Sequence, residues 1–66
     1  MPATIVEIPG RIGSLVDVKF YREKGRRSTY IGTYIVNDGT LYDASHNRLT
    51  SGLTLESARL VMANAR

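Results

Sequence analysis

The sequence predicts an α+β fold in which an antiparallel β-meander of 3–5 short strands packs on one C-terminal α-helix. Three observations lead to this prediction. Apolar and polar residues alternate over the segment 3–50, glycine-containing turns interrupt that alternation, and the apolar period changes to about 3.6 residues in the segment 53–66. With 66 residues and no internal repeat, the chain is expected to form a single domain, 1–66.

The first two strands are predicted from their alternation. Ala3–Ile8 is β-branched and reads as an edge strand. We expect this strand to end at Pro9, because proline cannot donate to a strand ladder, and a turn to follow over Pro9–Gly13. Ser14–Arg22 alternates cleanly, and the face that carries Phe20 is expected to form the core.

The remaining strands follow from three turns. Glu23–Arg27 is expected to connect a hairpin with about four to five residues. Ser28–Asn37 is apolar on both faces, as in a central strand; Ile31, Thr33 and Ile35 are expected on one face, and Tyr30, Tyr34 and Val36 on the other. Asn37–Gly39 predicts a second tight hairpin, and Ser45–Asn47 a weaker turn before a short strand at Arg48–Thr50.

Three signals predict the start of the C-terminal helix. Thr54 is a suitable N-cap, Glu56 lies in the first turn, where the helix dipole favours an anion, and Leu53 and Ala58 occupy the positions of a hydrophobic staple. One apolar stripe is expected to pack on the sheet, consisting of Leu55, Ala58, Val61, Met62 and Ala65. Leu60 lies outside this stripe.

Composition limits the class of protein. Apolar residues make up 42% and charged residues 23%, as in a globular chain. No apolar run is long enough to span a membrane and no signal peptide is visible, so we expect a cytoplasmic protein without a membrane partner. A core of this size stabilises a domain only marginally, and the chain has no cysteine for a disulfide, so a homodimer is a further prediction.

Residues for catalysis are not identifiable. The single histidine, His46, is interpreted as a solvated turn residue, which leaves no ligand set for a tetrahedral metal. The serines have no paired histidine, the carboxylates are scattered one per element, and the glycines do not form a phosphate-binding loop. We therefore expect no enzyme activity, no catalytic residue, no metal and no cofactor.

A cluster of basic residues surrounds the first hairpin turn. Five of the nine lysines and arginines lie within residues 19–27, and tyrosines interleave with them. Cations contact phosphates, and tyrosines stack on bases. The cluster predicts a DNA- or RNA-binding module whose site residues are Lys19, Tyr21, Arg22, Lys24, Arg26, Arg27 and Tyr30. The alternative is a solvated hairpin whose charges serve solubility.

Two pieces of the chain carry a resemblance to a known family. "FYREKGRRSTYIGTY" followed by "LTLESARLVMANAR" resembles the arm-type DNA-binding domain of phage-integrase tyrosine recombinases, and the two pieces cover about half of the chain. The family has a small three-stranded sheet with a helix behind it; here an additional hairpin, Ile35 to Gly52, separates the pieces. The resemblance implies that the sheet face enters the DNA groove with Lys19, Tyr21, Arg22, Arg26, Arg27 and Tyr30.

A second function class fits the same chain. Small sheet-and-helix proteins of this size are typical of phage- or plasmid-encoded accessory proteins that bind a protein partner, for example anti-CRISPR-like inhibitors of a host nucleic-acid-binding enzyme. For this protein-interaction module, the predicted interface residues are Tyr34 and Leu60.

Overall fold

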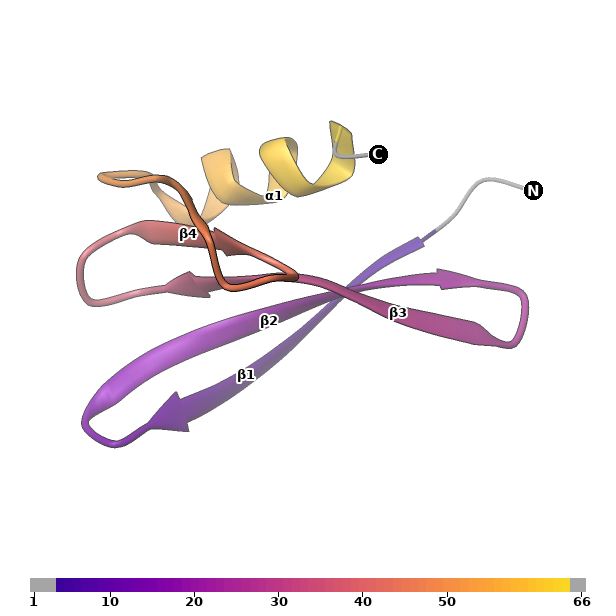
Figure 1. Ribbon diagram of the computed structural model, residues 1–66, viewed down its shortest axis with the longest axis horizontal. Helices are drawn as coiled ribbons and strands as arrows, with labels where there is room; N and C mark the ends of the chain where they lie inside the picture. The colour runs from indigo at the N-terminus through magenta and orange to yellow at the C-terminus, as the bar shows by residue number, and fades with distance from the viewer. Residues whose placement is uncertain (1–3, 65–66) are drawn as a thin grey trace.

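A five-stranded antiparallel sheet and one C-terminal helix form the fold in the computed structural model, which describes residues 4–64 (Figure 1). The sheet order β1-β2-β3-β4-β5 follows the chain, so the sheet is a meander. This confirms the predicted α+β class. The elements are β1 (Thr4–Ile12), β2 (Leu15–Lys24), β3 (Arg27–Ile35), β4 (Thr40–Asp43), β5 (Arg48–Thr50) and α1 (Leu55–Asn64).

The edge strand β1 is longer than predicted. It continues through Pro9, which pairs with Val18, and ends at Ile12. Proline is tolerated because β1 lies at the edge of the sheet, where one side of the strand makes no hydrogen bonds to another strand. The expected turn over Pro9–Gly13 is therefore wrong, and a tight turn at 13–14 connects β1 to β2.

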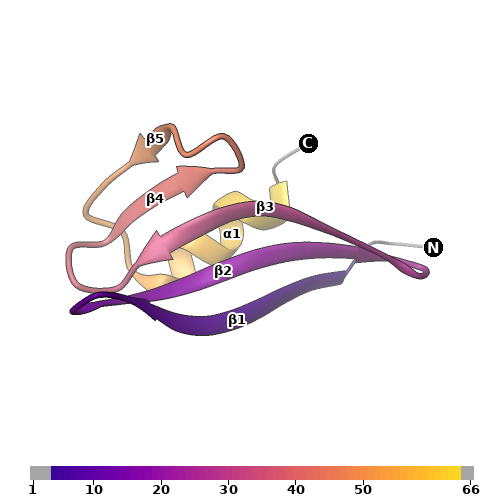
Figure 2. The ribbon, with the colours of Figure 1, turned by 60° about the horizontal axis from the view of Figure 1, so that its bottom comes forward.

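The β2–β3 hairpin is tighter than predicted. Lys24 pairs with Arg27, so only Gly25 and Arg26 connect the strands, instead of four to five residues. Gly25 has a φ of 60°, and a two-residue hairpin loop needs such a left-handed residue, which glycine adopts without steric cost. Both ribbon views show the tip of this hairpin extending beyond the end of α1 (Figures 1 and 2).

A β-bulge in this hairpin changes which residues share a face. The register between β2 and β3 shifts between Phe20 and Tyr21. Ile31 is the additional residue in β3 and packs against the core, whereas Thr33 and Ile35 line the opposite face. The expectation that these three residues share a face is therefore wrong, because a bulge interrupts strict alternation.

The core lies between α1 and one face of the sheet. Figure 2 shows α1 behind the sheet. The helix begins as predicted, because the Ser57 amide donates to Thr54 Oγ1 at 3.1 Å. Ala58 and Met62 are buried, but Val61 is 39% exposed and does not belong to the buried stripe. Ala65 lies outside the described residues. The buried cluster consists of Val18, Phe20, Tyr34, Leu41, Ala58 and Met62.

Gly32 lets the helix and β4 approach the centre of β3. A Cβ atom at this position would lie 2.4 Å from the carbonyl oxygen of Tyr42 and 3.0 Å from Sδ of Met62. The first distance is shorter than real Cβ contacts, and the second would require the Met62 side chain to shift, so the close approach of β4 to Gly32 depends on the missing side chain.

The predicted hairpin at Asn37–Gly39 is confirmed. The Gly39 amide donates to the Ile35 carbonyl at 2.8 Å, and the Thr40 amide donates to Asp38 Oδ1 at 3.0 Å. These hydrogen bonds hold the polar group of Asp38 inside the turn, as is usual for aspartate at this place.

Candidate nucleic-acid interface

The sheet face opposite α1 has no covering element among residues 4–64 (Figure 2). Apolar side chains nevertheless lie along it. Ile8, Ile12 and Leu15 are 50%, 52% and 41% exposed, and the strand register places them on the same side as Lys19. We call this surface the open face. An uncovered apolar surface of this kind is typical of a binding site.

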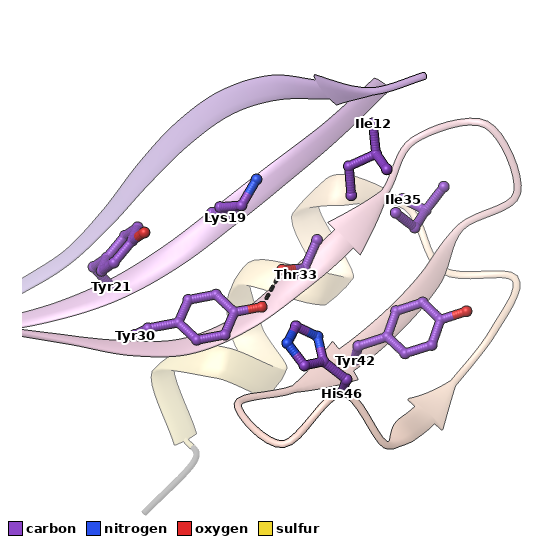
Figure 3. A pocket seen from close by; sticks show the side chains of 8 residues that line it. All are labelled: Ile12, Lys19, Tyr21, Tyr30, Thr33, Ile35, Tyr42 and His46. Carbon is purple, nitrogen blue, oxygen red and sulfur yellow. Dashed lines mark hydrogen bonds between the residues drawn. The ribbon is translucent and has the colours of Figure 1, made fainter. Parts of the chain in front are cut away.

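A hollow of about 440 Å³ lies on the open face (Figure 3). Its volume falls in the range of roughly 300–1,000 Å³ that ligand pockets have. Side chains from four strands and the β4–β5 turn meet there. The lining residues are Ile12, Lys19, Tyr21, Tyr30, Thr33, Ile35, Tyr42 and His46.

Three aromatic rings form a connected group in this hollow. The ring centroids of Tyr21 and Tyr30 are 5.6 Å apart with an interplanar angle of 57°, and those of Tyr30 and His46 are 6.1 Å apart with an angle of 40°. The Tyr30 hydroxyl shares a hydrogen bond with Thr33 Oγ1, which fixes the central ring (Figure 3). The group therefore presents several ring surfaces in tilted orientations.

Backbone hydrogen bonding places His46 beside Tyr30. Asp43 Oδ1 accepts from the amides of Ser45 and Asn47, each at 2.9 Å, and the His46 amide donates to the Asp43 carbonyl at 3.0 Å. His46 has a φ of 65°, a conformation uncommon for residues with a side chain. The residue is exposed in a turn, as expected, but its ring also lines the hollow.

Lys19 forms an ion pair on the open face. Its Nζ donates to Oδ2 of Asp17 at 2.8 Å; the Asp17 side chain has no exposed surface, whereas that of Lys19 is 40% exposed. The hydrogen bond to Asp17, together with the charge of that carboxylate, raises the pKa of Lys19. Oδ1 of Asp17 has no hydrogen-bond partner among the described residues.

The structure separates the predicted nucleic-acid-binding residues into three groups. Lys19, Tyr21 and Tyr30 meet in the hollow. The cationic tip, which we define as Lys24, Arg26 and Arg27, is exposed at the end of the hairpin. Arg22 is half-buried on the helix side, where it lines a second hollow of about 350 Å³ together with Ile31 and Met62.

The two predicted protein-interface residues have different environments. Tyr34 is only 4% exposed, and its hydroxyl donates to the Leu53 carbonyl at 2.6 Å. This corrects the expectation of an interface at Tyr34, because the bulge turns its side chain into the core. Leu60 is 62% exposed on the outer side of α1, and its role in an interface or a homodimer stays a prediction.

Several residues of the hollow are absent from the predicted site. Tyr42 alternates with buried Leu41, a period-2 signal that was available in the sequence. No local pattern indicated that His46 would reach Tyr30, because the contact joins β3 to a turn that follows β4. Ile12 was assigned to a turn and reaches the hollow only because β1 continues past Pro9.

Two features that would indicate other kinds of site are absent from residues 4–64. These residues contain no helix long and apolar enough to cross a membrane, and they contain no group of three histidines or carboxylates able to hold a metal ion. Comparison with protein-family models, curated proteins and solved structures gives no match for this chain.

Proposed function

We propose that the protein binds nucleic acid through the β2–β3 hairpin and the hollow on the open face. One observation carries this proposal: two tyrosines of the hollow, Tyr21 and Tyr30, lie on the same hairpin as the cationic tip. Tyr21 precedes Lys24 in β2, and Tyr30 follows Arg27 in β3. Cations supply affinity for the phosphate backbone, and exposed rings stack on bases, so the two features together fit a nucleic-acid ligand.

Salt dependence measures the contribution of the cationic tip. Because Lys19 is already paired with Asp17, we expect phosphate contacts mainly from the three cations of the tip. Each neutralised phosphate contributes about −0.9 to the slope of log affinity against log salt for a duplex and about −0.7 for a single strand, so three contacts give about −2.7 or −2.1.

The experiment is a titration of labelled oligonucleotides at several salt concentrations. Arg26→Ala combined with Arg27→Ala is expected to reduce the slope by about 1.4 to 1.8. Arg11→Ala combined with Arg59→Ala is the matched control, since it removes the same charge from exposed positions that lie neither in the tip nor on the open face. Absence of binding at low salt, or equal effects of the two double variants, would contradict the proposal.

A second candidate function is a protein-interaction module, such as an inhibitor of a nucleic-acid-binding enzyme. The exposure of Ile8, Ile12 and Leu15 favours it, because these residues extend the apolar surface away from the cationic tip. Ile8→Ser combined with Leu15→Ser changes two residues that do not line the hollow. For a protein partner, this variant would lose binding to a candidate enzyme; for nucleic acid, it would keep its oligonucleotide affinity.

A further inference from the structure

The hollow and the cationic tip differ in net charge. The tip exposes three cations at the end of the hairpin. Of the described residues that line the hollow, only Lys19 is a lysine, arginine or carboxylate, and its ammonium is balanced by Asp17 at 2.8 Å. A balanced charge attracts a phosphate weakly, whereas an apolar hollow with aromatic walls suits an uncharged, planar group.

Lys19 retains hydrogen-bonding capacity in this arrangement. An ammonium has three N–H donors, and one of them is used by Oδ2 of Asp17. The ion pair holds Nζ beside the hollow, and the two remaining donors are available to an acceptor that enters it. Carbonyl oxygens and ring nitrogens at the edge of a nucleobase are acceptors of this type. Asp17 is thus a positioning residue for Lys19.

Base stacking decides between a duplex and a single strand. In a duplex, the faces of each base are covered by its neighbours, and only the base edges are accessible in the grooves. Tyr21, Tyr30 and His46 present ring surfaces within a hollow, and ring surfaces stack on bases that are unstacked or splayed out.

We infer that the ligand of the open face is single-stranded DNA or RNA, with one unpaired base in the hollow and the adjoining phosphates on the cationic tip. This inference rests on the proposed nucleic-acid function. The hollow and the tip are about four residues apart along β2, or about 13 Å at the rise of a strand, so an oligonucleotide is needed to contact both.

The test compares oligothymidine and oligouridine of about eight nucleotides, within the range of known site sizes, with a duplex of the same length. Tyr21→Ala removes a ring, and Tyr21→Phe keeps it. Stacking on one ring corresponds to about a 5- to 150-fold change in affinity, so we expect Tyr21→Ala to weaken single-strand binding by this factor and Tyr21→Phe to bind like the wild type.

His46→Gly provides a variant whose backbone stays favourable. Glycine adopts the φ of 65° found at this position more readily than histidine, so the fold should be retained while one ring of the hollow is lost. We expect weaker single-strand binding and an unchanged salt slope, because the ring contacts no phosphate. The urea-denaturation midpoint of each variant checks that it is folded.

Different results would contradict single-strand binding and nucleic-acid binding in general. If a duplex binds as tightly as the single strands, or if Tyr21→Ala weakens both ligands equally, the single-strand inference is overturned while nucleic-acid binding stands. A change in salt slope on Tyr21→Ala or His46→Gly would also overturn it, because the hollow would then contact phosphate. If no oligonucleotide binds the wild type, both proposals fail.

Discussion

The two faces of the sheet are both apolar, but only one of them is covered by the described chain. On the helix face, Phe20, Leu41 and Met62 are at most 1% exposed, whereas Ile8 and Ile12 on the open face are about half exposed. Burying apolar surface stabilises the folded state by about 25 cal/mol per Å² of area removed from water. Stability therefore comes chiefly from the helix face, and the open face keeps apolar area that a ligand can still bury.

Phe20→Ala is expected to have the largest effect. Truncating a fully buried phenylalanine costs about 3–5 kcal/mol of unfolding free energy, which is comparable to the total that a core of this size supplies. We expect circular dichroism to show a largely unfolded chain. Ile8→Ala on the open face is the control, with an expected change of about 0.5 kcal/mol or less. An equally large loss for Ile8→Ala would show that the open face is also packed.

Gly32→Ala tests how closely the helix face is packed. The added methyl group would meet the Tyr42 carbonyl oxygen, which belongs to the backbone and moves only with β4. Overpacking of this type costs about 1–3 kcal/mol, measured as a lower urea midpoint. Ser28→Ala, at an exposed position of the same strand, is the control. An unchanged midpoint for Gly32→Ala would mean that α1 and β4 are free to shift.

The sequence predicted the elements better than their faces. Turn signals and the N-cap at Thr54 are local, and the structure confirms the meander and the helix start. The bulge at Ile31 was not predictable, because β3 is apolar on both faces and either register buries large side chains. The same bulge moved Tyr34 into the core and left Tyr30 in the hollow.

The candidate site was predicted in part for a related reason. Charge density along the chain identified the cationic tip, which is a local feature. The ion pair of Lys19 with Asp17 was not predictable, because the burial of the Asp17 carboxylate depends on neighbouring residues of the folded sheet. Alternation alone placed Asp17 and Lys19 on the more polar face of the strand. The contact of His46 with Tyr30 likewise depends on tertiary structure.

Thr54→Ala is expected to destabilise α1, which covers the helix face of the sheet, by a moderate amount. Loss of an N-cap hydroxyl costs about 1 kcal/mol of unfolding free energy, and Thr54→Ser should retain most of it because the accepting oxygen remains. Thermal denaturation of the two variants provides the measurement. Oligonucleotide affinity should stay unchanged in both, since α1 lies on the other side of the sheet from the hollow. A loss of affinity in the folded variant would mean that the faces are coupled.

The smallest expected effect is a difference in how the ion pairs on the two faces contribute to stability at high pH. On the helix side, Arg59 pairs with Glu7, and this pairing raises the pKa of a guanidinium that already stays charged at any ordinary pH. On the open face, Asp17 raises the pKa of Lys19 above the value of about 10.4 that an unfolded lysine has. The Lys19 pair therefore contributes stability that is fully present below about pH 10.4 and is lost as the pH rises through the raised pKa.

Lys19→Arg isolates this contribution, because a guanidinium keeps its charge and its donor to Asp17 in alkali. We expect the urea midpoint of the wild type to fall more steeply than that of Lys19→Arg as the pH rises above about 10.4, where the unfolded lysine has lost its proton and the folded Lys19 still holds it. The charges of Tyr21 and Tyr30 also raise the pKa of Lys19, so the difference between the two curves reports Lys19 together with these two tyrosines. Parallel curves would show that the ammonium contributes equally to the folded and unfolded states, and Asp17 would then not hold Lys19 beside the hollow.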